Sequence, residues 1–162
     1  MIRRARRDAR VESSHDIREE HRSLIAEFLE AHPVGEEIRY IFGRIPAYVS
    51  AAPTARVFSA RDRAGALVAF DVAEFGAVEY AFYQFNFRSR RYDVPGASDL
   101  LLDAVITAAR SEGKRFLNLG LGINPGVRRF KEKWGGRPFL GYECCRYAPG
   151  RPTLFDALLH KL

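Results

Sequence analysis

The pattern that most constrains the fold of this chain lies between residues 56 and 121. Three short segments typical of strands (56–60, 66–75 and 78–88) follow one another, and the turn-forming sequence Asp62-Arg-Ala-Gly65 separates the first two. Tight connections of this kind join antiparallel neighbours rather than parallel ones. The sequence therefore predicts an antiparallel meander of three strands.

An amphipathic helix and a further apolar segment follow this meander. The helix ends near Gly113, where a C-terminal cap is expected, and the segment 115–121 has the length of a short strand. Strand, helix and strand in this order predict two parallel strands joined by a right-handed crossover over 78–121. The apolar positions that form the buried stripe of the helix are Leu101, Leu102, Val105, Ile106 and Ala109.

Two helices are predicted before the meander. Apolar residues recur at helical spacing from Ile17 to Leu29, and Pro33 and Gly35 end that helix. A second helix is expected from Glu36 to Arg44, ended by Pro46.

The C-terminal part predicts one more helix, then a strand and a short helix. Asn124 is a suitable N-cap and Pro125 suits the first helical position. That helix is expected to bury Val127, Phe130 and Trp134 and to end at Gly135-Gly136. A final strand is expected over 138–147, and a last helix after Thr153.

Length and charge indicate one domain with a basic N-terminus. The chain has 162 residues, 47% of them apolar, and a net charge of +6. We predict a basic flexible tail over 1–14 and a single domain over 15–162. The tail suits nucleic acid or a phosphorylated substrate, but a solvated, frayed terminus is the simpler explanation of its charge. Its arginines are Arg3, Arg4, Arg6, Arg7 and Arg10.

The cysteines indicate a reducing compartment. Cys144 and Cys145 are adjacent, so a structural disulfide between them is not expected, and no Cys/His spacing fits zinc. No apolar run reaches the roughly 20 residues of a membrane span. We therefore expect a cytoplasmic protein with no metal and no membrane span, whose oligomeric state the sequence leaves open.

Two segments carry a resemblance to the GNAT acyltransferase superfamily. "PGASDLLLDAVITAARSEGKRFLNLGLG" (95–122) resembles the helix–strand core of these enzymes. "FKEKWGG" (130–136) is similar to the F-K-x-x-[FW]-G signature of Fem-type aminoacyltransferases and lysyl-phosphatidylglycerol synthase C-terminal domains. The resemblance covers roughly residues 55–147. It implies an α+β fold, an α/β sandwich whose mixed, mostly antiparallel sheet has a central splayed parallel strand pair and helices on both faces.

The resemblance also implies where a donor would bind. Acetyl-CoA-binding members carry Arg/Gln-x-x-Gly-x-Gly/Ala before the central helix, where backbone N–H groups hold the pyrophosphate. Here the best register runs from Arg91 to Gly96, with Val94 in place of the middle glycine. The implied cofactor-binding residues are Arg90, Arg91, Gly96, Ala97 and Ser98.

This loop departs from the family pattern in its charge as well. Asp93, Asp99 and Asp103 lie near the helix start, and carboxylates there repel a bound pyrophosphate. Fem-type enzymes also have a degenerate loop, and they take aminoacyl-tRNA as donor. The expected donor co-substrate is therefore acyl-CoA or aminoacyl-tRNA.

Three residues are predicted to be catalytic. By the match to the Phe-Lys pair, Lys131 would stabilise the acyl carbonyl or its developing negative charge. A lysine at the edge of an apolar stripe also fits a surface side chain. Asn118 lies within a strand, where it would bind substrate or a buried backbone group. Tyr142 is a candidate for proton transfer.

Three further polar residues are predicted to bind substrate: Gln84, Asn86 and Asn124. Strict alternation places Gln84 and Asn86 on one face of their strand, together with Tyr80 and Phe82, and Tyr83, Phe85 and Phe87 on the other. A bulge or a strand-end position explains Gln84 and Asn86 almost as well.

The function expected from the resemblance is transfer of an acyl or aminoacyl group to an amine acceptor, whose identity stays open. The alternative is a non-catalytic module of the same fold that binds a protein or RNA partner through its arginines.

Overall fold

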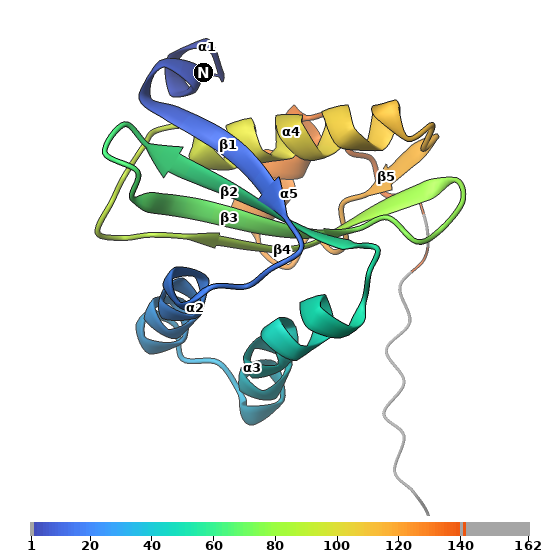
Figure 1. Ribbon diagram of the computed structural model, residues 1–162. Coiled ribbons are helices and arrows are strands. Elements are labelled where there is room, and N and C mark those ends of the chain that lie inside the picture. Colours follow the sequence, from blue (N-terminus) through green and yellow to red (C-terminus); the bar gives the residue numbers. More distant parts are fainter. Residues whose placement is uncertain (1, 140, 142–162) are drawn as a thin grey trace, which may run out of the picture.

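The computed structural model describes residues 2–139 and 141 (Figure 1). Tyr142 and the predicted final helix lie outside this range, as does most of the predicted final strand. The helices are α1 (Ile2–Asp8), α2 (Glu19–Ala31), α3 (Glu36–Ala51), α4 (Ala97–Ser111) and α5 (Pro125–Lys133). The strands are β1 (Ala9–Ser14), β2 (Ala55–Asp62), β3 (Leu67–Glu74), β4 (Tyr80–Arg88) and β5 (Phe116–Asn118).

The strands form one mixed sheet in the order β1-β2-β3-β4-β5. The first four strands pair antiparallel, and β4 pairs parallel with β5. Helix α4 makes the crossover between these two parallel strands (Figure 1). The predicted meander and the predicted parallel pair are both confirmed.

Helices cover both faces of the sheet (Figure 1). On one face α4 contributes Leu101, Leu102 and Val105 to a core that also receives α1 and the partly buried aromatic residues of α5. On the other face, α2 and α3 enclose a second core that contains Phe70 and Phe87. The predicted α/β sandwich is therefore confirmed.

The predicted flexible tail over 1–14 is wrong. Residues 2–8 form α1 and residues 9–14 form β1, which pairs with β2 from Ala9↔Asp62 to Ser14↔Val57. Ala5 is fully buried, and the Arg6 guanidinium donates to Asp103 on α4 at 2.8 Å. The backbone pairing of β1 and the burial of Ala5 order a segment whose charge alone suggested a solvated tail.

The second helix is longer than predicted, because α3 continues through Pro46 to Ala51. Proline removes one backbone donor from a helix, which usually ends it. Here Ile45 and Val49 lie one turn apart and are both buried against the sheet. Burial of this stripe outweighs the lost hydrogen bond.

The last strand and helix of the described chain also differ from the prediction. β5 ends at Asn118 instead of Leu121, because the Asn118 side chain accepts the Gly120 N–H at 2.8 Å and Gly120 turns the chain with φ +66°. In α5, Phe130 and Trp134 are half-buried rather than fully buried.

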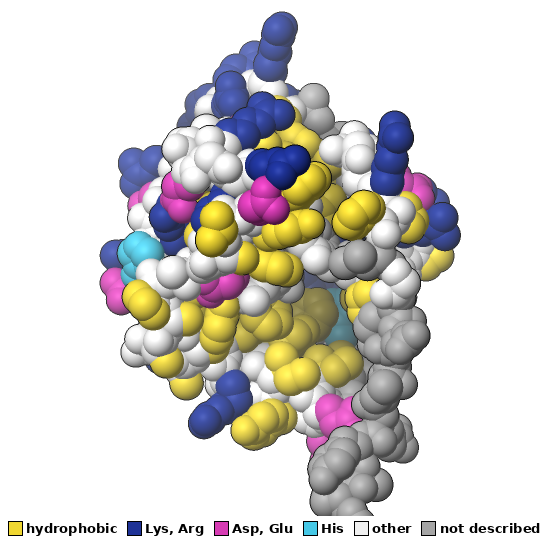
Figure 2. Space-filling view, turned by 90° about the vertical axis from the view of Figure 1, so that its right-hand side faces the viewer, with side chains coloured by type: hydrophobic (Ala, Val, Ile, Leu, Met, Phe, Trp, Pro, Cys, Tyr) yellow, Lys and Arg dark blue, Asp and Glu magenta, His cyan; other side chains and the backbone are white. Residues whose placement is uncertain are grey.

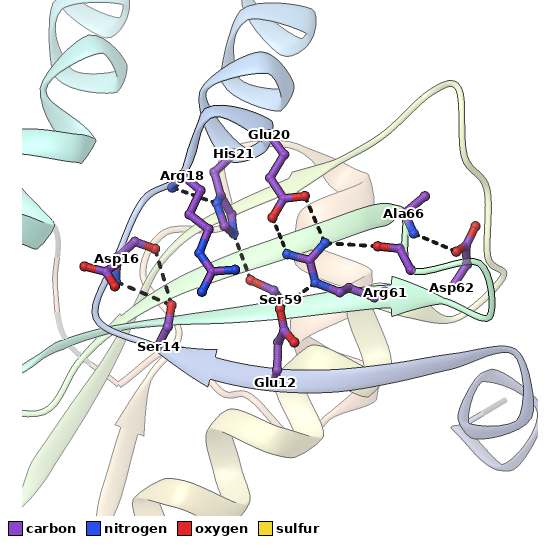
Figure 3. A network of polar contacts seen from close by, with 11 residues as sticks. Glu12, Ser14, Asp16, Arg18, Glu20, His21, Ser59, Arg61, Asp62 and Ala66 are labelled. Carbon is purple, nitrogen blue, oxygen red and sulfur yellow. Dashed lines mark hydrogen bonds and ion pairs between the residues drawn. The ribbon is translucent and has the colours of Figure 1, made fainter.

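A polar network joins α2 to the edge of the sheet (Figure 3). The Arg61 guanidinium on β2 donates to Glu12 on β1 at 2.5 Å and to Glu20 on α2 at 2.9 Å. The hydrogen bond from Arg61 lowers the pKa of Glu20. His21 accepts the Arg18 N–H at its Nδ1, so its Nε2 carries the proton that bonds Ser59 Oγ at 2.8 Å.

Candidate active site

The parallel strands β4 and β5 separate after a short stretch of pairing. They pair at only three positions, the last of which is Phe82↔Asn118. β4 then continues to Arg88, whereas β5 ends at Asn118. Within the described part of the chain, the second half of β4 thus has no strand partner on this side, and a wedge opens between the two strands.

A β-bulge in β4 lies where the wedge begins. On the β3 side, Tyr83 pairs with Ala73 and Phe85 pairs with Val72, so Gln84 has no paired residue. Such an extra residue leaves backbone groups available and bends the strand. Gln84 also lies beyond the last residue pair between β4 and β5.

The bulge corrects the predicted faces of β4. The Asn86 amide and the Tyr83 hydroxyl both donate to Asp71 Oδ1, at 2.5 Å and 3.2 Å. Both side chains therefore lie on the face covered by α4, whereas strict alternation had placed them on opposite faces. Asn86 does not share a face with Phe82, because the extra residue Gln84 shifts the alternation by one.

The loop between β4 and α4 is held in shape by its own polar contacts. The Ser89 hydroxyl accepts the N–H groups of Arg91 and Tyr92, each at 3.1 Å. Gly96 occupies the N-cap position of α4 with φ 87°, and no side chain caps the helix. The N–H groups of its first turn, such as that of Ser98, are therefore open to an anion.

The three aspartates near the start of α4 are all paired with basic side chains. Asp93 bonds Arg88, and Asp103 bonds Arg6. Asp99 is 5% exposed and accepts Lys133. It also accepts the Trp134 indole N–H at 2.8 Å. The expected repulsion of a pyrophosphate by these carboxylates is thus offset within the protein.

The predicted cofactor residues follow one another along this loop, although their side chains differ in placement. Arg90 and Arg91 line a hollow beside α2 together with Glu27 and Glu30. Gly96, Ala97 and Ser98 form the start of α4, and the Ala97 side chain is fully buried.

Lys131 lies beside the wedge. Its ammonium group donates to the Leu121 carbonyl at 2.5 Å. A Cβ built on Gly120 would lie 3.8 Å from both Lys131 Nζ and the Tyr83 carbonyl, which brings α5, β4 and the end of β5 together. Burial lowers the pKa of Lys131.

Of the other predicted polar residues, some lie beside the wedge and one lies at the start of α5. Asn118 ends β5 at the last paired position, with its oxygen bonded to the backbone of Gly120. Gln84 is exposed at the bulge. Asn124 caps α5 by accepting the Val127 N–H at 2.9 Å. The structure brings Lys131 and Asn118 close to the bulge, whereas Asn124 acts as a helix cap.

The face of β4 and β5 opposite α4 is aromatic. The rings of Tyr80 and Phe116 stack at 5.0 Å, and those of Tyr80 and Phe82 lie 6.3 Å apart. We call these three residues the aromatic face. Figure 2 shows hydrophobic side chains gathered around a hollow on the side of the molecule that carries the β3–β4 turn.

Two residues important to this region were missed by sequence reasoning. Asp71 is fully buried, and burial raises its pKa to about 8. A carboxylate in the apolar segment "LVAFDVAE" is the signal that marks it. Tyr48 on α3 donates to Glu74 at 2.5 Å; burial, followed by this hydrogen bond, raises the pKa of Tyr48 to about 12.

Two negative findings apply to the described residues. None of their helices is long and apolar enough to cross a membrane. Among the same residues, no group of three or more His, Cys, Asp or Glu side chains is placed to hold a metal ion.

Comparisons with known proteins identify the fold. No family model matches the chain, and no curated protein matches its sequence. A ribosomal-protein-alanine N-acetyltransferase from Brucella melitensis biovar Abortus 2308 has a similar structure with a TM-score of 0.66 and 15% identity. The alignment covers 86% of this chain and 99% of that enzyme.

Other solved acetyltransferases give the same result. An acetyltransferase from Trypanosoma brucei is similar with a TM-score of 0.62 and 16% identity, covering 86% of this chain and all of that one (100%). The aminoglycoside N-acetyltransferase AAC(6')-Iy, solved with a CoA-containing bisubstrate analogue, is similar with a TM-score of 0.64 and 14% identity. That alignment covers 86% of this chain and 98% of the enzyme. The chain therefore has the GNAT fold, which is the fold of N-acetyltransferases.

Proposed function

We propose that this protein is an N-acyltransferase that takes its acyl group from acyl-CoA. The observation that carries this proposal is the wedge between β4 and β5, with a bulge in β4 at its narrow end. A thioester arm that enters the wedge would run along the unpaired half of β4 as an added strand. Its carbonyl would then reach the backbone of Gln84.

Acyl transfer needs donors for the oxyanion that forms when the amine attacks the thioester carbonyl. The C–N bond forms, the C–S bond breaks, coenzyme A leaves as the thiolate, and the proton that the amine loses passes to that thiolate or to solvent. A backbone N–H at the bulge of β4 would donate to the oxyanion. The Lys131 ammonium, held beside the wedge by Leu121, would add positive charge there.

The start of α4 would hold the pyrophosphate of the donor. Its uncapped N–H groups at Ser98 and Asp99 supply donors and the positive end of the helix dipole. The bond from Lys133 to Asp99 reduces the competing negative charge. Arg91, exposed in the preceding loop, is available to the phosphates.

The acceptor amine would approach over the aromatic face, opposite α4. Two neighbours act on different amines: one is named for ribosomal-protein alanine and one for aminoglycosides. Peptides with an N-terminal alanine and neamine-type aminoglycosides are therefore reasonable first acceptors to assay here. AAC(6')-Iy, solved with CoA, favours acyl-CoA as donor over aminoacyl-tRNA.

Thermal unfolding with acetyl-CoA tests donor binding. At 100 times its dissociation constant, a ligand stabilises the folded state by about 2.7 kcal/mol, which corresponds to a Tm rise of several degrees. Ser98→Glu adds a negative charge at the start of α4, where it suits the helix but repels a pyrophosphate. We expect this variant to fold normally and to lose the acetyl-CoA shift.

Thr107→Glu is the matched control, because it adds the same charge to an exposed position nearer the other end of α4. It should keep the full shift. Absence of a shift in the wild type, or an equal shift in Ser98→Glu, would contradict acyl-CoA binding at this helix.

A non-catalytic RNA-binding module is the second candidate, favoured by one observation. Arg3, Arg4 and Arg7 are exposed on the ordered helix α1, where they are available to phosphates. RNA binding that weakens steeply with salt, together with no response to acetyl-CoA, would favour this candidate.

A further inference from the structure

Asp71 is a fully buried carboxylic acid within the central part of the sheet. It lies on β3 beneath α4, and its Oδ2 has no hydrogen-bond partner among the described residues. A buried polar atom without a partner costs roughly 1–3 kcal/mol. An acid kept at such a position calls for a role that an apolar side chain would not fill.

The contacts of Asp71 join the two sides of the β4 bulge. Its Oδ1 accepts the Asn86 amide at 2.5 Å and the Tyr83 hydroxyl at 3.2 Å. Residues three positions apart in a regular strand point to opposite faces. Both side chains reach one oxygen only because Gln84 is an extra residue between them.

We propose that Asp71 is the positioning residue of this bulge: by binding Tyr83 and Asn86 at once, it holds the backbone of Gln84 in the wedge. The regular register, without the bulge, would move one of the two side chains to the other face and break its bond to Asp71. The catalytic meaning of this role rests on the proposed function, in which Gln84 faces the acyl carbonyl.

The groups around Asp71 fit this role. The residues that bond to it are Tyr83 and Asn86 of β4, and the core that covers this face from α4 is apolar. Asp99 on α4 acts on Tyr83 through its charge and is itself bonded to Lys133 on α5. Burial raises the pKa of Asp71 to about 8, and in either protonation state its Oδ1 can accept these two hydrogen bonds.

Amide hydrogen exchange without ligand tests the role of Asp71 directly. Asp71→Asn keeps the Oδ1 acceptor, whereas Asp71→Leu removes it. We expect the amides of Tyr83 and Phe85, the paired residues on either side of the bulge, to exchange at least about 10-fold faster in Asp71→Leu, and to stay near the wild-type rate in Asp71→Asn. Asn86→Ala breaks the shorter bond from an exposed residue and should show the same local change if Asp71→Leu does not fold.

Val105→Ala controls for general loss of stability, because Val105 is fully buried in α4 over the same core. It should leave exchange at the bulge unchanged relative to the rest of β4. Acetyl-CoA affinity should fall about 10-fold or more in Asp71→Leu and Asn86→Ala but not in Asp71→Asn.

The proposal is overturned if the bulge amides exchange at the wild-type rate in Asp71→Leu or Asn86→Ala, or if Val105→Ala accelerates them equally. Because exchange is measured without ligand, it tests the positioning role separately from donor binding. Failure of the wild type to bind acetyl-CoA would instead count against the proposed function.

Discussion

At the scale of single residues, the proposed acyl transfer at the wedge depends most on Lys131. It is half-buried on α5, its ammonium bonds the Leu121 carbonyl, and burial lowers its pKa. The amine is therefore held beside the wedge instead of extending freely into solvent. This placement is compatible with the predicted role, which activity measurements can test.

Lys131→Ala should reduce acetyl transfer by roughly 10- to 100-fold, because a preorganised positive charge near the oxyanion would be lost. Release of coenzyme A from acetyl-CoA in the presence of a peptide or aminoglycoside acceptor measures this rate. Arg129→Ala, at an exposed position on the same helix, should keep the wild-type rate. Equal rates in wild type and Lys131→Ala would remove Lys131 from the mechanism.

Asp71 should make the protein less stable as the pH rises. Its folded-state pKa of about 8 lies above the ordinary value of 3.8, so the folded state keeps a proton that the unfolded chain releases between these values. The stability from this group is complete below about pH 4 and is lost as the pH rises towards 8, by at most about 1.4 kcal/mol per unit. Between pH 5 and pH 7.5 in urea unfolding, the free energy of unfolding should change in Asp71→Asn without this downward contribution, so the wild type should become less stable relative to Asp71→Asn as the pH rises.

His21 should have the opposite dependence. Burial lowers its pKa below 6.5, so the unfolded chain takes up a proton that the folded state resists. Stability from the neutral ring is therefore present above pH 6.5 and is lost as the pH falls below that value. As the pH falls from 7.5 to 5.5, the wild type should become less stable relative to His21→Gln; an unchanged difference in unfolding free energy between the two would contradict this assignment.

At the scale of elements, a partly buried hydrogen bond contributes to the docking of α5 onto α4. The Trp134 indole N–H donates to Asp99, which is 5% exposed. Trp134→Phe keeps most of the ring but leaves the carboxylate one donor short, so unfolding free energy should fall by about 1 kcal/mol or more. Urea unfolding measures this change, with Phe139→Leu, at a position 78% exposed, as the control that should be neutral.

The sequence predicts the elements best where periodicity is strong. α4 has a clear apolar stripe, and its predicted position agrees with Ala97–Ser111. α1 and β1 were missed because their arginines dominate the composition, while the contacts that order them come from β2 and α4. Similarly, α3 tolerates Pro46 because the helix packs against the sheet, and the residues around Pro46 do not reveal this packing.

The candidate site was only partly predictable for a related reason. The Phe-Lys pair and the loop before α4 were found from a resemblance carried by adjacent residues. The bulge at Gln84 depends on pairing with β3, and the bond from Lys133 to Asp99 joins two helices. Contacts between distant segments of this kind leave no short pattern in the sequence.

At the scale of the whole molecule, helices pack on both faces of one sheet, and in the described residues its parallel strand pair, β4 and β5, separates after three paired positions. All the groups assigned to the reaction come from elements that meet there: β4, β5, α5 and the start of α4 (Figure 1). The wedge therefore follows from the arrangement of these elements, whereas in the proposed function the choice of amine acceptor depends on the side chains of the aromatic face.

Amide hydrogen exchange with and without coenzyme A tests the central claim, that an acyl-CoA arm occupies the wedge. Binding should protect two segments: residues 83–88 of β4, and the loop with the first turn of α4 at residues 94–99. Residues 9–14 of β1, at the far edge of the sheet, should be unaffected. Saturating coenzyme A that protects neither segment, or protects β1 instead, would contradict the account.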